Sequence, residues 1–172
     1  MPKLDSVTVS LNFGPFGGIS GTWKPNDVER KAAWELYVEL VSRVSVVKLP
    51  EDQGILREGL NSLYSVFQST REILRRYGPD VAPPRKNGGL SLGRMALMVL
   101  NFQLRPLLTK WHPVLLEYED QRKAGTSVKK HEDIWGRAKE LRADIDATRK
   151  VLVEYSVQLS KIAQIEPLHE AR

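Results

Sequence analysis

The chain has 172 residues, a net charge of +5 at pH 7 and no cysteine. Without cysteine, disulfides and thiolate metal sites are excluded, and 41% hydrophobic with 27% charged residues is typical of a globular protein. The apolar run after Leu97 is interrupted by Asn101, Gln103 and Arg105, and the first residues lack the apolar core of a secretory signal. We therefore expect a cytoplasmic protein with no membrane span and a single domain over residues 1–172.

Residues 1–25 are predicted to form a β-hairpin arm. Polar residues separate four apolar ones at a period of two, which indicates a half-buried strand: Val7, Val9, Leu11 and Phe13. A glycine-rich turn at 14–18 and a second strand at 19–23 follow. Because an isolated hairpin is marginal in water, its apolar face must lie on the remainder of the chain, with Trp23 and Trp34 as the expected anchors.

Four helices are predicted, over residues 26–49, 51–77, 91–122 and 127–163. Asn26 and Glu29 form a capping-box pattern at the start of the first helix, and Gly78 ends the second. Short connections make consecutive helices antiparallel neighbours. The predicted fold is all-α: an elongated antiparallel four-helix bundle, up-down-up-down, with the short N-terminal β-hairpin packed on it.

Apolar seams support three of these helices, because residues spaced alternately by three and four share one helix face. The seam of the first helix is Ala33, Tyr37, Leu40, Val44 and Val47; that of the second is Leu56, Leu60, Leu63, Phe67, Thr70, Leu74 and Tyr77. The seam of the fourth helix is the most regular. It runs Ile134, Ala138, Leu141, Ile145, Thr148, Leu152, Tyr155, Leu159 and Ile162.

The helix predicted over residues 91–122 is apolar on nearly all sides, so something must cover it. The hairpin, a second copy of the chain or a different protein could do so, since large exposed apolar patches usually mark interfaces. The residues that we expect to take part in such an interaction are Met95, Met98, Phe102 and Trp111.

Pro106 and Pro113 are predicted to kink or break the same helix, because each removes a hydrogen bond and clashes with the carbonyl four residues back. Arg105 and His112 precede these prolines and should leave helical geometry. The freed carbonyls would then need donors, for which Arg105, Lys110 and the indole of Trp111 are suitable. The alternative is that the broken helix presents a polar functional site.

Arg105 and His112 are also the candidate catalytic pair. An arginine followed by four to six residues and a histidine resembles the catalytic motif of HEPN ribonucleases, which are small all-helical bundles. The resemblance implies that His112 acts as acid or base at the ribose 2′-hydroxyl while Arg105 steadies the phosphate. A proline follows Arg105 where that family usually has a small polar residue.

Six basic residues should gather at one end of the bundle. They are Arg71, Arg75, Arg76, Arg85, Lys86 and Arg94. Cations are expected at a helix C-terminus for the dipole alone, but such a cluster could also bind an acidic protein surface, a phosphate-bearing ligand or nucleic acid. Tyr77 is the only aromatic residue nearby, which disfavours single-stranded nucleic acid.

No pattern in the sequence indicates a cofactor or a metal site, because the three histidines lie far apart without the spacing of zinc ligands. The leading hypothesis is therefore a non-enzymatic helical-bundle protein that acts through protein–protein contact, as an adaptor, sensor or accessory subunit. Its partner would be another protein or a second copy of itself. The alternative is a HEPN-like, metal-independent ribonuclease using Arg105 and His112, and the third hypothesis is binding of nucleic acid or another acidic partner through the basic end.

Overall fold

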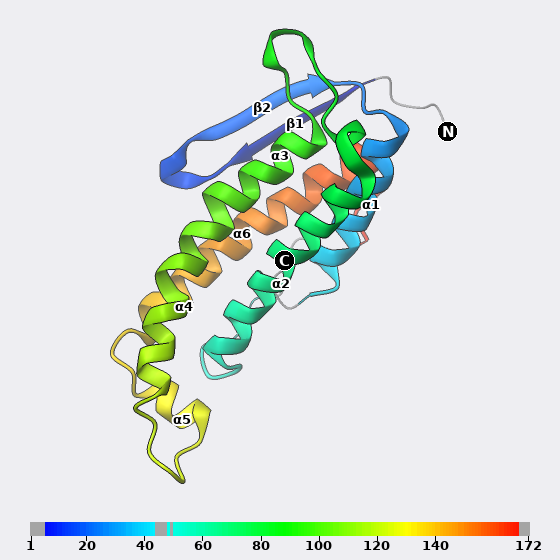
Figure 1. Cartoon of the computed structure of the whole chain (residues 1–172). Helices are drawn as coiled ribbons and strands as arrows, with labels where there is room; N and C mark the ends of the chain where they lie inside the picture. The colour runs from blue at the N-terminus through cyan, green and yellow to red at the C-terminus, as the bar shows by residue number, and fades with distance from the viewer. Residues whose placement is uncertain (1–5, 44–47, 49, 169–172) are drawn as a thin grey trace.

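The computed structural model describes residues 6–43, 48 and 50–168, which form a mostly helical protein with a small antiparallel hairpin near the N-terminus (Figure 1). The expected seam positions Val44 and Val47 lie outside the described residues. Among the described helices, none combines the length and the apolar character needed to cross a membrane.

The hairpin consists of β1 (Val7–Asn12) and β2 (Gly18–Trp23), joined by a 3-10 turn at Gly14–Phe16. As the alternation predicts, the apolar residues of β1 are buried and the polar ones are exposed. Its buried face packs against α6 (Ala138–Ala163). On β2, Gly21 has no side chain because Leu90 occupies that space: a Cβ built there would lie 2.9 Å from the Leu90 Cβ.

Helix α1 (Asp27–Val41) begins with the predicted capping box of Asn26 and Glu29, while α2 (Leu56–Tyr77) begins five residues later than expected. Two features explain the late start of α2. Gly54 adopts a positive φ of 74°, which leaves helical geometry. In addition, the Glu132 carboxylate accepts the backbone N–H groups of Leu56 and Arg57 and so caps the helix from another element.

The third helix, which was predicted to be kinked or broken at Pro106 and Pro113, is not broken at either proline. Helix α3 (Leu92–Met98) continues through a π-helical segment (Val99–Leu104) into α4 (Arg105–Glu119), and Arg105 itself has helical φ and ψ of −57° and −48°. The Arg105 N–H bonds to the Leu100 carbonyl, one residue further back than in an α-helix. This wider turn just before Pro106, which lies in the first turn of α4, accommodates the proline without ending the helix.

The predicted fourth helix is divided into α5 (Val128–Asp133) and α6, with the chain between them non-helical around Gly136. Ile134, which the sequence assigned to the buried seam, is 77% exposed because it lies in this interruption. From Leu141 to Ile162 the seam is buried or half-buried as predicted. It faces α1, α2 and the hairpin.

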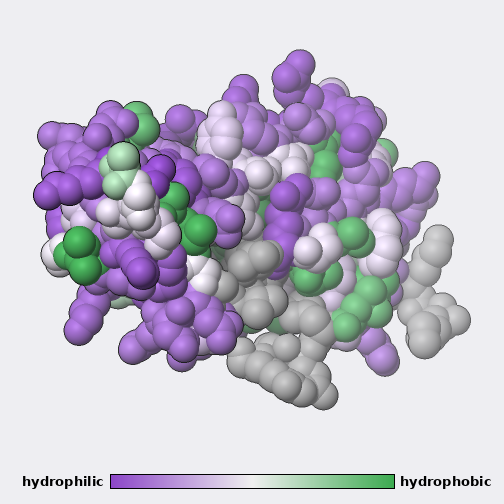
Figure 2. Space-filling view, turned by 90° about the horizontal axis from the view of Figure 1, so that it is seen from below, coloured by the Kyte–Doolittle hydropathy of each residue, from purple (hydrophilic) through white to green (hydrophobic). Residues whose placement is uncertain are grey.

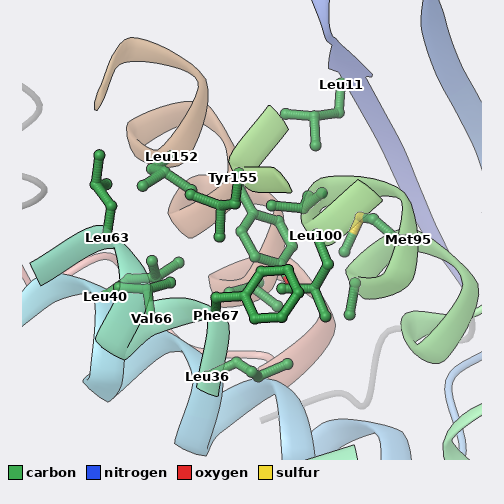
Figure 3. Packing of buried hydrophobic residues seen from close by; sticks show 14 of the residues in the cluster. Leu11, Leu36, Leu40, Leu63, Val66, Phe67, Met95, Leu100, Leu152 and Tyr155 are labelled. Atoms are coloured by element: carbon green, nitrogen blue, oxygen red, sulfur yellow. The ribbon is translucent and has the colours of Figure 1, made fainter. Parts of the chain in front are cut away.

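The core lies where the hairpin, α1, α2, α3 and α6 meet (Figure 3). Among its labelled residues, Leu11 comes from the hairpin, Leu36 from α1, Phe67 from α2 and Tyr155 from α6. The third helix is thus covered within the chain over most of its surface. Leu97, Phe102 and Leu116 remain exposed on it.

Candidate functional site

The sequence-predicted pair Arg105 and His112 lies on the face of α4 that packs against α2. The two residues are seven apart, and Glu119 follows after another seven, so the three form a stripe along one helix face. The Arg105 guanidinium lies 5.2 Å from the centre of the Phe67 ring, and its Nε donates to Asn101.

His112 contacts two residues of α2. Its Nδ1 lies 2.7 Å from Nη1 of Arg57, and its ring meets that of Tyr64 edge-on with 5.9 Å between the ring centres. Arg57 in turn donates two hydrogen bonds of 2.9 Å to the Glu119 carboxylate. These contacts form a half-buried series of hydrogen bonds from His112 through Arg57 to Glu119.

This geometry determines the protonation of the His112 ring. A guanidinium can only donate, so Nδ1 must accept, and the proton of the neutral ring lies on Nε2. Burial, followed by the positive charge of Arg57, lowers the pKa of His112 below its usual value, although the carboxylate of Glu119 opposes this change. The lone pair that a general base would use is therefore bound by Arg57.

Arg105 and His112 do not share a partner. Two helical turns, about 11 Å along the axis, separate them, and each is held by a different residue of α2. The residues that the sequence reasoning missed are Arg57, Tyr64 and Glu119. A signal was present: Arg57 and Tyr64 are seven apart, matching the spacing of Arg105, His112 and Glu119 on the facing helix.

Two of the three donors expected to satisfy the broken helix, Lys110 and Trp111, bind carboxylates, while Arg105 donates to the side-chain amide of Asn101. Lys110 bonds to Glu140 and Asp144, and the Trp111 indole donates to Asp144 at 2.8 Å. Because the helix is continuous at Arg105, no break there requires such donors. The contacts of Lys110 and Trp111 tie α4 to α6.

The basic residues divide into two groups. Arg76 is paired with Glu35, Arg94 donates to the Gly88 carbonyl, and Arg85 makes a salt bridge of 2.6 Å with the fully buried Glu29. The exposed members of the cluster whose side chains form neither an ion pair nor a hydrogen bond within the described chain are Arg71, Arg75 and Lys86. Half of the predicted basic surface is thus engaged in internal contacts.

Glu29 is a structural centre that the sequence showed only as a capping residue. Its carboxylate also accepts from the Trp23 indole and from the backbone N–H of Leu92. Arg85 lies over the Trp23 ring at 5.7 Å. The hairpin, α1 and α3 are therefore joined at one buried charge, and Trp23 is an anchor of the hairpin as expected. Trp34 instead stacks on Tyr37 of its own helix.

The four predicted interaction residues also lie in different environments. Met95 and Trp111 are completely buried, so they belong to the core of the chain, and Met98 is half-buried against it. Phe102 is 39% exposed and lies beside the tip of the hairpin. Of the four, it is the one that a partner can reach most readily.

The tip of the hairpin presents an exposed aromatic pair. Phe16 is 58% exposed and stacks on Phe102 at 6.1 Å between ring centres, and the buried Phe13 meets Phe102 in a tilted contact at the same distance. The sequence signal was Phe16 itself, an aromatic residue within a turn of glycine and proline. We use the term hairpin surface for Phe16, Phe102 and the exposed residues of β2, which are Gly18, Ser20 and Thr22.

The opposite end of the molecule has a different character. Seen from below, it is mainly hydrophilic, with hydrophobic residues in small separate groups (Figure 2). A cavity of about 470 Å³ near the start of α2 is lined by charges of both signs, among them Glu132, Asp133 and Arg142. Within the described part of the chain, no group of three or more histidine and acidic residues could hold a metal ion.

In comparisons with known proteins, no family model, curated protein or solved structure matched this chain. The interpretation of the site therefore depends on its own geometry. That geometry offers a half-buried hydrogen-bonded chain of His112, Arg57 and Glu119, and an exposed pair of aromatic side chains, Phe16 and Phe102, on the hairpin surface.

Proposed function

We propose that this protein is a non-enzymatic module that acts through protein–protein contact, as an adaptor, sensor or accessory subunit, on an antiparallel four-helix scaffold. The hairpin surface is its contact site. The observation that carries the proposal is the stacked pair of Phe16 and Phe102, which remains 58% and 39% exposed. Aromatic side chains at interfaces contribute large contact areas, and they are enriched among the residues that dominate binding.

The polar groups of α4 favour contact over catalysis. A general base must have a free lone pair within reach of the proton that it removes, whereas Arg57 occupies Nδ1 of His112. Arg105, the expected phosphate ligand, lies over Phe67. A ribonuclease at this site would have to release Nδ1 of His112 from Arg57 before the ring could take up a proton.

The proposal can be tested in the native host by crosslinking the protein to its neighbours and identifying them by mass spectrometry. We expect Phe16→Ser to lose the partner crosslinks that the unaltered protein forms. Ile134→Ser is the matched control, because it removes a similarly exposed apolar side chain near α5 and should keep them. Equal loss in both variants, or no loss in Phe16→Ser, would count against the hairpin surface.

A parallel assay addresses the ribonuclease alternative. Purified protein is incubated with labelled single-stranded and structured RNA, with His112→Ala as the comparison. We expect no cleavage above that of the variant. RNA cleavage that disappears in His112→Ala would overturn the non-enzymatic proposal.

A further inference from the structure

The pairing of the two strands shows which backbone groups of the hairpin face outward. The Phe13 N–H donates to the Gly17 carbonyl at 2.8 Å, so these two residues form a hydrogen-bonded pair. In an antiparallel ladder, hydrogen-bonded and non-hydrogen-bonded pairs alternate. By this alternation and the observed register, the non-hydrogen-bonded pairs are Asn12–Gly18, Ser10–Ser20 and Thr8–Thr22.

Two contacts agree with this assignment. The Thr8 and Thr22 hydroxyl oxygens are 2.8 Å apart, as expected where the side chains of a non-hydrogen-bonded pair approach closely. The Ser10 N–H points away from β2, because it donates to Oε1 of Gln158 at 3.4 Å. Gln158 belongs to α6, so α6 meets the outer edge of β1.

The outer edge of β2 has no such cover. By the same alternation, the N–H and carbonyl groups of Gly18, Ser20 and Thr22 point away from β1. All three residues are exposed, and within residues 6–43, 48 and 50–168 no hydrogen bond to these backbone groups is formed outside the hairpin. The hairpin therefore has one covered edge and one open edge.

The open edge lacks the features that proteins use to prevent strand pairing. Such features are a proline, a charged side chain or a bulge on the edge strand, and β2 (Gly18–Trp23) contains none of them in its continuous six-residue register. The residues whose backbone groups point away from β1 are Gly18, Ser20 and Thr22. Because their side chains are small, the backbone of another strand can approach this edge closely.

We propose that β2 pairs with β2 of a second copy of this chain, antiparallel and about a two-fold axis through Ser20. Gly18 would then face the partner's Thr22, and the two Ser20 residues would face each other. The result is a four-stranded sheet whose inner face packs on the helices of both copies. This inference deepens the proposed function, on which it rests, by naming the first partner of the hairpin surface.

Pairing at this edge favours a closed dimer over a polymer that continues from chain to chain. Helix α6 packs along β1 and bonds its edge at Ser10, so β2 provides the open edge of each chain. Antiparallel pairing of two copies uses both open edges at once and leaves none for a third chain, so the assembly closes as a two-fold dimer.

The test is the mass in solution, measured by light scattering over a range of concentrations. At several hundred micromolar we expect twice the 19.5 kDa of one chain. Ser20→Lys and Ser20→Glu each place like charges opposite one another at the two-fold axis, and each should raise the dissociation constant by about two- to fivefold. Ser10→Lys is the matched control: its charge lies on the same exposed face but on β1, and the dimer should persist.

Mixing the two charged variants is the decisive step. Ser20→Lys and Ser20→Glu should form a mixed dimer, since opposite charges now face each other, and circular dichroism should show both variants folded. A wild-type mass of one chain at every concentration, a dimer insensitive to Ser20→Lys, or no mixed dimer would overturn the inference. Each of these results leaves the crosslinking test at Phe16 intact, so failure of the dimer and failure of the proposed function are separate outcomes.

Discussion

The carboxylate of Glu29 accepts a hydrogen bond of 2.6 Å from Nη2 of Arg85, which lies 56 positions further along the chain. Both groups are removed from most solvent, and the carboxylate also accepts from the Trp23 indole and from the backbone N–H groups of Asn26 and Leu92. This ion pair holds the hairpin against the helices. The hairpin surface therefore depends on it for its position.

We expect Glu29→Gln to lower the free energy of unfolding by about 3 kcal/mol, because it leaves the buried Arg85 cation without its counter-ion. Urea denaturation followed by circular dichroism measures the change. Glu35→Gln is the control: it breaks a more exposed pair with Arg76 and should lower the free energy by less than about 1 kcal/mol. Equal effects of the two variants would contradict the structural role of Glu29.

Protonation of His112 should make the folded protein less stable as the pH is lowered. The pKa of this ring is lowered in the folded state, so the unfolded chain, with a value near 6.5, takes up its proton first as the pH falls. The free energy of unfolding then decreases below about pH 6.5 until the folded ring is also protonated. Because the ring is only half-buried, we expect about 0.5 kcal/mol between pH 7 and pH 5.

His112→Asn isolates this contribution. Asparagine keeps an acceptor near the position of Nδ1 but does not titrate, so the variant should lose less stability than the wild type between pH 7 and pH 5. Glu132, whose pKa is raised mainly by burial, titrates in both proteins and cancels in the comparison. Parallel curves for the two proteins would contradict the lowered pKa of His112.

The hydroxyl of Tyr155 is buried in the core and has no hydrogen-bond partner among the described residues. Burial also raises the pKa of this phenol. We expect Tyr155→Phe to raise the free energy of unfolding by about 1 kcal/mol, because it removes a polar group that is buried without a partner.

Tyr37 provides the comparison for this prediction. It is equally buried, but its hydroxyl accepts from the Leu168 N–H at 2.6 Å. Tyr37→Phe should therefore lower the free energy of unfolding by about 1 kcal/mol. Thermal unfolding of both variants measures whether the free energy of unfolding rises or falls in each. A loss of stability in Tyr155→Phe would show that the Tyr155 hydroxyl has a hydrogen-bond partner.

Much of the fold could be predicted from local patterns. The alternation of β1, the capping box at Asn26 and the seam from Leu141 to Ile162 each depend on residues close in sequence, and each is confirmed. The start of α2 was predicted too early, because its cap comes from Glu132 in a distant element. A break of the third helix at its prolines was also predicted wrongly: a π-helical turn precedes Pro106, and Pro113 lies inside α4.

The candidate site was harder to predict for the same reason. Arg105 and His112 were identified by residue type and spacing. Their neighbours on α2 are determined by how the two helices pack against each other, which is a tertiary contact. Likewise, the sequence shows Arg85 only as a basic residue in a loop, and its ion pair with Glu29 forms through the tertiary fold. The open edge of β2 depends on which face of the hairpin meets α6, which the sequence alone does not contain.

The central claim is that the open edge of β2, within the hairpin surface, pairs with a second copy of the chain. Amide hydrogen exchange by nuclear magnetic resonance tests it most directly, with the amides of Gly18, Ser20 and Thr22 compared in dilute and concentrated protein. We expect these three amides to exchange rapidly when dilute and to become protected on concentration, while Gly21 changes little because its amide already bonds to β1. Rapid exchange of the three amides at every concentration would contradict pairing of two copies at this edge.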